Sequence, residues 1–273
     1  MMYVAIDSNK DRIQIENASS NTEYFCPICG ERLIIKAIDS KSIRKHFAHK
    51  SKKDCDDFSH DMSDWHYNWQ CCFPEETREI VLENNGVKHR ADILINDTII
   101  EFQHCPITAD EIKKRNEFYL SCGYNMVWVF DADGKIKNDY CNSNSINPLE
   151  CGTNDLVWKR ERSQFYDPMP NNVIVFLDYK INIKTKDKEY NNIDNLIMLK
   201  NVDRKFIDFY ETKPNLIFHS NFIKQFGVNI DNVLSISDIL SINKEYHRKQ
   251  NEARTKQTPI ILLNRNKGRH WRF

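Results

Sequence analysis

The clearest pattern of hydrophobic and polar residues lies on either side of Asn96-Asp97, a dipeptide that favours a tight turn between two short apolar runs. The pattern predicts a β-hairpin with Asp92 on one strand and Glu101 and Gln103 on the other. Residues two apart in a strand point to the same face, so Glu101 and Gln103 should project together. Pairing across the turn can also bring Asp92 beside Glu101.

A period of 3.6 residues predicts helices over residues 59–73 and 108–121. The second begins with the capping-box pair Thr108–Glu111. Trp65 and Trp69 share one face of the first helix, and we interpret them as core residues rather than as platforms for base stacking.

Shorter apolar runs predict strands around the hairpin and beyond it, at residues 33–35, 79–83, 126–130, 156–159, 173–178 and 196–200. Polar and mixed stretches complete the pattern as a small hairpin within residues 1–24, a loop at 142–147, a mixed segment at 206–226 and a helix near 235–242. The predicted order is a helix, a strand, the hairpin, a second helix and a further strand. This order predicts a compact α/β core of the α+β class.

The composition narrows the class of protein. With 273 residues, 40% of them hydrophobic and 29% charged, the chain can bury a core and has room for two domains. It lacks both a charged-then-apolar start and a membrane-length apolar run, so we expect a cytoplasmic protein without membrane contact. In that compartment the nine cysteines should be reduced, some of them bound to metal.

The net charge is zero, but the segment from Lys244 to Phe273 is basic and includes Trp271. Such a tail can follow a phosphate backbone and stack on a base. A solvated, frayed terminus is the simpler interpretation.

Metal-ligand spacing appears early in the chain. Cys26 and Cys29 are separated by two residues, Pro27 and Ile28, and Gly30 follows them, as in a zinc knuckle. Two further ligands must come from three candidates, which are His46, His49 and Cys55. We expect structural Zn²⁺, because a full set of sulfur and nitrogen ligands leaves no position for water.

Several motifs occur in a fixed order, namely Cys26-Pro-Ile-Cys29, His46-Phe-Ala-His49, Cys55, Ser63-x-x-His66, Arg90-Ala-Asp92, Glu101-Phe-Gln103, Arg115-x-x-x-Tyr119 and Trp128-Val-Phe130. Together, over roughly residues 20–131, the chain resembles the CoiA-like family of competence proteins, which are predicted PD-(D/E)xK nucleases with an N-terminal zinc-binding motif.

The resemblance implies a restriction-endonuclease-like core at residues 59–135. We expect a zinc-binding β module at 1–58 before this core. After it we expect a region of unclear role at 136–273, where a protein partner could bind. In the family, the helix that carries His66 often has a Glu before the Ser and a Lys four residues after the His. Met62 and Gln70 stand at those places here.

By the same resemblance, Asp92, Glu101 and Gln103 take the catalytic positions. The two carboxylates would bind Mg²⁺ or Mn²⁺ with the Phe102 carbonyl, and Gln103 would orient the attacking water. His66 is either a second ligand or proton carrier, or a tie between helix and sheet.

Five further residues have open roles. Arg115 and Tyr119 share a helix face and either contact the DNA backbone or serve a structural purpose, such as an Arg115 bond to an acid of the sheet. Glu79 is a further candidate for the site, although we interpret it as an exposed acid at a strand end. His104 and Cys105 indicate a second zinc site only weakly.

The sequence therefore predicts a Mg²⁺- or Mn²⁺-dependent deoxyribonuclease acting in DNA uptake, processing, recombination or defence. The first alternative is an inactive nucleic-acid-binding adaptor that uses the zinc module and the basic tail, which the amide of Gln103 in place of Lys favours. The second is a zinc-stabilised protein-interaction module, which would leave the hairpin unexplained. DNA strandedness, RNA as the substrate and a homodimer all stay open.

Overall fold

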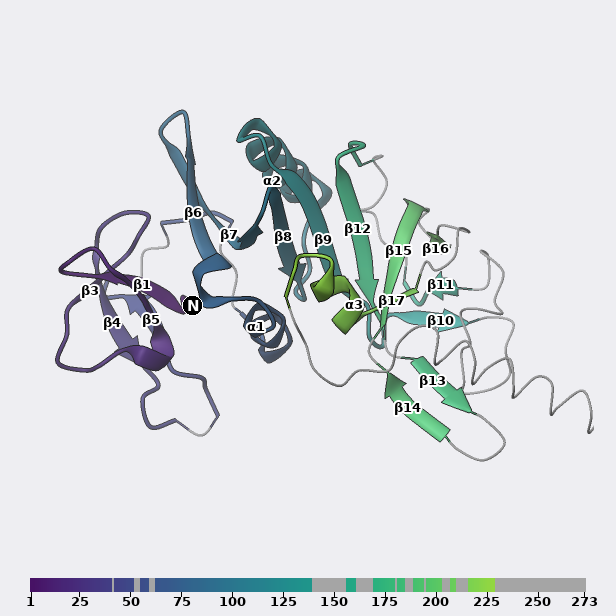
Figure 1. The fold of residues 1–273 in the computed structure, drawn as a ribbon, viewed down its shortest axis with the longest axis horizontal. Helices are drawn as coiled ribbons and strands as arrows, with labels where there is room; N and C mark the ends of the chain where they lie inside the picture. The colour runs from purple at the N-terminus through teal and green to yellow at the C-terminus, as the bar shows by residue number, and fades with distance from the viewer. Residues whose placement is uncertain are drawn as a thin grey trace, which may run out of the picture.

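The computed structural model describes residues 1–40, 42–51, 55–58, 62–138, 156–160, 169–179, 181–184, 189–193, 195–202, 207–209 and 216–228. Within them, an N-terminal module lies beside one end of a larger α/β unit (Figure 1). None of the helices among these residues is long and apolar enough to cross a bilayer.

The N-terminal module is an antiparallel sheet of five strands in the order β2-β1-β3-β4-β5. Its elements are β1 (Val4–Asp7), β2 (Arg12–Gln14), η1 (Ile15–Asn17), β3 (Tyr24–Phe25), β4 (Arg32–Lys36) and β5 (His46–His49). Tyr3, Tyr24, Leu33 and the fully buried Phe47 form a small core. So few buried side chains are a weak source of stability on their own, which leaves a role for a metal ion.

The larger sheet runs in the order β16-β15-β12-β9-β8-β7-β6, with β17 also pairing with β15. Its strands are β6 (Arg78–Asn84), β7 (Val87–Ile95), β8 (Thr98–Gln103), β9 (Asn125–Asp131), β12 (Val173–Asp178), β15 (Asn195–Val202), β16 (Ile207–Phe209) and β17 (Leu216–Phe218). The central strands β8, β9 and β12 are parallel, and the remaining pairs are antiparallel. Two-stranded sheets, β10 (Ile136–Asn138) with β11 (Leu156–Trp158) and β13 (Ile181–Lys184) with β14 (Glu189–Ile193), complete the described strands.

Helices cover both faces of the larger sheet. One buried cluster joins α2 (Ala109–Ser121) to side chains of the central strands, including Trp128. The opposite cluster joins α1 (Asp64–Cys71) and α3 (His219–Lys224) to the alternate residues of the same strands, including Phe102. A short turn, η2 (Glu75–Thr77), connects α1 to β6. The sheet is therefore the middle layer of three, with α1 and α2 on opposite faces.

Most predicted elements are present within the described residues. Asn96 has a φ of +54° in the β7–β8 turn, as a tight hairpin requires. Ser63 and Thr108 cap the two helices by accepting from the backbone amides of His66 and Glu111. The α+β class is confirmed. The segments predicted at 142–147 and 235–242, and the basic tail, lie outside the described residues.

Two features go beyond the sequence expectation. The segment His46–His49 forms strand β5, which no periodicity predicted. The larger sheet also continues past residue 135, because β12 pairs in parallel with β9 from Val173–Met126 to Asp178–Asp131. A division of the chain at residue 135 therefore separates paired strands. Asp178 also accepts hydrogen bonds from the indoles of Trp65 and Trp69, which ties α1 to this later part.

Candidate functional site

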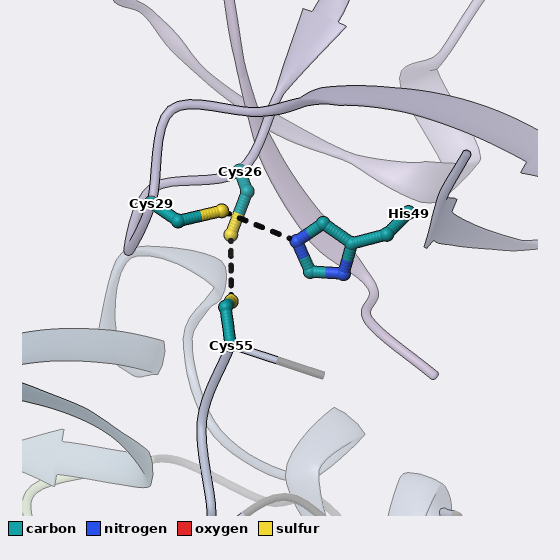
Figure 2. A group of neighbouring side chains, drawn as sticks. All are labelled: Cys26, Cys29, His49 and Cys55. Carbon is teal, nitrogen blue, oxygen red and sulfur yellow. Dashed lines mark hydrogen bonds between the residues drawn. The ribbon is translucent and has the colours of Figure 1, made fainter. Parts of the chain in front are cut away.

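The N-terminal module gathers four metal-ligand side chains, Cys26, Cys29, His49 and Cys55, whose ligand atoms all lie within 4.8 Å of one another (Figure 2). The Sγ atoms of Cys26 and Cys55 are 3.5 Å apart, and Cys29 Sγ is 3.4 Å from His49 Nε2. Ligands at the corners of a Zn²⁺ tetrahedron are roughly 3.5–3.8 Å apart, given zinc bond lengths of about 2.0–2.3 Å. The donor set and its spacing therefore fit a tetrahedral metal ion.

Local structure explains how this cluster forms. Cys26 follows β3 and begins a turn in which the Gly30 amide donates to the Cys26 carbonyl, with Gly30 at a φ of +74°. His49 ends β5. Its neighbour on the same strand, His46, lies outside the cluster and has its Nδ1 2.8 Å from the Arg44 carbonyl oxygen. Of the five candidate ligands, the structure brings four together and leaves His46 out.

The protonation chemistry of the cluster also fits a cation. Burial raises the pKa of Cys26, and burial together with the neighbouring Cys26 raises the pKa of Cys55. Without a positive charge nearby, these thiols stay protonated. A bound metal ion would stabilise the thiolate forms that serve as ligands.

A second site lies on the β7–β8 hairpin. The register that pairs Ile93 with Ile100 places Asp92 beside Glu101. The Asp92 amide donates to Glu101 Oε1 at 3.2 Å, and the Phe102 amide donates to Asp92 Oδ2 at 2.8 Å. Glu101 is buried and Asp92 is half-buried, and backbone amides fix these two carboxylates side by side on neighbouring strands.

Each helix contributes side chains to these carboxylates. On α1, His66 Nε2 lies 2.9 Å from Asp92 Oδ1, and Gln70 Nε2 donates to the same oxygen at 3.1 Å. On α2, Arg115 Nη1 donates to Glu101 Oε2 at 2.8 Å. The site thus joins a hairpin to the two helices on opposite faces of the sheet.

The two carboxylates differ in acidity. Burial alone would raise the pKa of Asp92, but His66 and the Phe102 amide hold it below its usual range. Burial and the charge of Asp92 raise the pKa of Glu101 to about 7, against the opposing effect of Arg115. A buried carboxylate that resists ionisation beside a second carboxylate is stabilised in its ionised form by a divalent cation, so these residues fit the expected Mg²⁺ or Mn²⁺.

The residues that follow β8 complete the pocket. Gln103 is buried, and its Nε2 donates to the Cys105 carbonyl at 2.8 Å. His104 is partly exposed, and its Nδ1 is 2.7 Å from Asp131 Oδ2 at the end of β9. The pocket lies at the carboxyl ends of the parallel strands, where ligand sites of open α/β sheets commonly lie. Its lining includes His66, Arg90, Asp92, Glu101, Gln103 and Arg115.

The two helix residues predicted as candidates for DNA contact, Arg115 and Tyr119, are both buried. The Arg115 guanidinium donates to the side chains of Glu101 and Glu111 and to the Phe58 carbonyl. Tyr119 has no exposed surface, which disfavours a direct contact with DNA.

Glu79 corrects a detail of the sequence interpretation, because it is 2% exposed rather than an exposed strand-end acid. Its carboxylate accepts from the amide of Tyr3, which precedes β1, and from the amide of Val4, the first residue of β1, at 3.1 Å each. Glu79 lies outside the pocket lining and joins the N-terminal module to β6.

Sequence reasoning left several functional partners unassigned. The bond from Gln70 to Asp92 could have been predicted, because Gln70 lies four residues after His66 on a predicted helix and so shares its face. Asp56 had no such signal. It directly follows Cys55, lies 2.8 Å from His89 Nδ1 and accepts from the Arg90 amide at 3.1 Å. This contact links the cysteine cluster to the strand that carries Asp92. Asp57, the second carboxylate beside His89, is exposed.

Comparison with known families matched two parts of the chain. Residues 7–58 match the model of the N-terminal domain of competence protein CoiA, and residues 73–189 match the model of its nuclease-like domain. The second match extends beyond β12, in agreement with the continuous sheet. Searches of curated proteins and of solved structures returned no match.

Proposed function

The chain belongs to the CoiA-like competence protein family, and from this membership and the geometry of the pocket we propose that it is a metal-dependent nuclease. Its substrate is DNA, and its reaction is hydrolysis of the phosphodiester bond during DNA uptake or processing. The family match itself supplies the coarser statement, that the chain carries a nuclease-like domain.

The observation that carries this proposal is the pair formed by Asp92 and Glu101. Two adjacent carboxylates in a pocket repel each other, and burial together with that repulsion raises the pKa of Glu101 to about 7. A structural role alone would be served better by one acid facing Arg115. A pair held by backbone amides on both sides is suited to a divalent cation.

When bound, Mg²⁺ or Mn²⁺ supplies charge stabilisation at phosphorus and a more acidic water. The residues of the chain do the rest. Asp92 and Glu101 would hold the cation, and Gln70 keeps Asp92 in place. His66 Nε2 lies 2.9 Å from Asp92 Oδ1, close enough to exchange a proton with that carboxylate. Because one Gln103 donor already bonds to the Cys105 carbonyl, its Oε1 is the atom that can accept a hydrogen bond from the attacking water.

We further propose that the Cys26, Cys29, His49 and Cys55 cluster binds structural Zn²⁺, whose four protein ligands leave no position for substrate.

The direct test is cleavage of single- and double-stranded DNA by zinc-loaded protein in Mg²⁺, Mn²⁺ or EDTA. We expect metal-dependent cleavage that falls by at least about a thousandfold in Asp92→Ala, since the variant loses a metal ligand. The matched control is Asp110→Ala, an exposed aspartate in the first turn of α2, which should cleave like the parent.

One outcome would support the adaptor instead. If the folded protein binds DNA but cleaves neither substrate with either metal, the nuclease proposal fails. Gln103 in place of a charged residue and the bond between Glu101 and Arg115 are the features that favour this second function.

A further inference from the structure

Two arginines, Arg90 and Arg115, line the pocket, and their surroundings differ. The Arg115 guanidinium donates to two carboxylates and to a backbone carbonyl. The Arg90 guanidinium donates no hydrogen bond to a described residue, and its ion pair is a loose one, with Nε 3.8 Å from Glu79 Oε2. Both terminal nitrogens of Arg115 are therefore engaged by the protein, and its Nε is buried without a partner in the described part of the chain. Arg90, in contrast, keeps its donors for a ligand in the pocket.

The side chain of Arg90 is nearly buried, with 9% of its surface exposed. A guanidinium carries five N–H donors, and none of the Arg90 nitrogens is both closed off from solvent and without a partner, so its unused donors open into the pocket. Glu79 compensates the charge but does not satisfy these donors, because the 3.8 Å between Nε and Oε2 is too long for a hydrogen bond.

The position of Arg90 indicates which ligand this is. Arg90 precedes Asp92 by two residues on β7, so both side chains project to the same face and line the same pocket. The pocket attracts a divalent cation at Asp92 and Glu101 and presents a guanidinium beside them. It therefore suits an anion that contacts both the cation and Arg90. Phosphate oxygens match the planar fork of a guanidinium especially well.

The side chain of Gln103 adds a second reason. An amide provides no positive charge, so charge that develops on phosphate oxygens must be balanced by another residue. Among the described pocket residues, Arg90 is the cation whose donors the protein does not use.

We propose that Arg90 is the phosphate-binding residue of this pocket, where its guanidinium donates to the non-bridging oxygens of the phosphodiester. The inference rests on the proposed function for the identity of the ligand, but it concerns binding and can be measured without turnover. A purely structural Arg90, which only balances the charges of Glu79, Asp56 and Asp92, is the competing explanation.

The test measures the affinity of the zinc-loaded protein for a fluorescein-labelled oligonucleotide, single- or double-stranded, in Ca²⁺ at several salt concentrations. Each lost phosphate contact lowers the slope of log affinity against log salt by about 0.7–0.9. We expect Arg90→Gln to lower the slope by about that amount and to weaken binding by about ten- to a hundredfold. Arg90→Lys should keep the slope, because it keeps the charge, but bind less tightly than the parent because it loses the fork.

The control is Lys88→Gln on the same strand, which removes a half-exposed charge paired with Glu83 and absent from the pocket lining. Its slope should match that of the parent. Inorganic phosphate should compete with the oligonucleotide more strongly for the parent than for Arg90→Gln, which separates a phosphate site from a general effect of charge. Thermal unfolding of each variant identifies any loss of fold.

The outcomes separate this inference from the nuclease proposal. A reduced slope in Arg90→Gln supports phosphate binding whether or not the parent cleaves DNA. An unchanged slope in folded Arg90→Gln overturns it, even if the parent is an active nuclease. If the parent binds neither oligonucleotide, both proposals fail.

Discussion

At the scale of single residues, the acidity of Glu101 is the most informative property of the pocket. Burial and the charge of Asp92 raise its pKa to about 7, whereas Asp92 itself is held below its usual range. Near neutral pH one carboxylate is ionised and the other is close to half-protonated. A cation that binds both must displace a proton from Glu101.

This acidity predicts how metal binding depends on pH. Below pH 7 a proton occupies Glu101 and competes with the cation, so Mn²⁺ affinity should fall by about tenfold for each pH unit. Above pH 7 Glu101 is already ionised, and affinity should level off. Calorimetric titration with Mn²⁺ between pH 6 and pH 8, in two buffers of different ionisation enthalpy, measures both the affinity and the protons released.

A control separates Glu101 from its neighbour His66, whose ring also lies at Asp92. The variant His66→Asn keeps a polar side chain but cannot lose a proton in this range. The dependence of Mn²⁺ affinity on pH should persist in His66→Asn. An affinity that is flat from pH 6 to pH 8 in the parent would contradict the assignment to Glu101.

At the scale of elements, sequence patterns predicted what depends on neighbouring residues and missed what depends on distant ones. The hairpin that brings Asp92 beside Glu101 followed from a turn dipeptide and apolar runs. Glu79 gave no such signal, because the amides that bury its carboxylate lie 75 and 76 positions earlier in the chain. The pairing of β9 with β12 also depends on residues distant in the chain. Strand β5 was missed because its two histidines hide the alternation of apolar and polar residues.

Glu79 gives a prediction about β6. Its φ of +48° is unfavourable for a residue with a Cβ, so its bonds to β1 must maintain it. In Glu79→Gln, one acceptor is replaced by an NH₂ group that faces amide donors. We expect the free energy of unfolding to fall by about 1–3 kcal/mol, measured by urea denaturation.

The comparison for this prediction is Glu83→Gln on the same strand, an exposed acid paired with Lys88. It should change stability by less than about 0.5 kcal/mol. Equal effects of the two substitutions would mean that the contact with β1 adds no stability to the junction.

At the scale of the whole molecule, the N-terminal module contacts the nuclease-like part at several places rather than through one linker. Arg12 donates to the carbonyls of Glu76 and Arg78, and Gln14 donates to that of Glu75. Asp56 provides the contact closest to the pocket, through His89 and the Arg90 amide on β7. The metal cluster and the carboxylate pair are thus mechanically connected, although their chemistry is separate.

Loss of the metal ion should therefore affect both parts. Cys29→Ser removes one ligand, and we expect it to abolish stoichiometric zinc and to lower Tm by on the order of ten degrees. Because Cys55 directly precedes Asp56, release of the cluster should also loosen β7 and weaken Mn²⁺ binding at Asp92. Elemental analysis, thermal unfolding and Mn²⁺ titration measure these effects on one preparation.

The matched variant is His46→Asn, since His46 lies on the same strand as His49 but bonds to the Arg44 carbonyl instead of joining the cluster. It should keep one zinc per chain and a Tm close to that of the parent. Zinc lost from His46→Asn and kept by Cys29→Ser would show that the ligand set differs from the one described. If Cys29→Ser loses zinc yet binds Mn²⁺ normally, the Asp56 contact does not transmit the state of the cluster, and the module stabilises the pocket less than its contacts with β7 suggest.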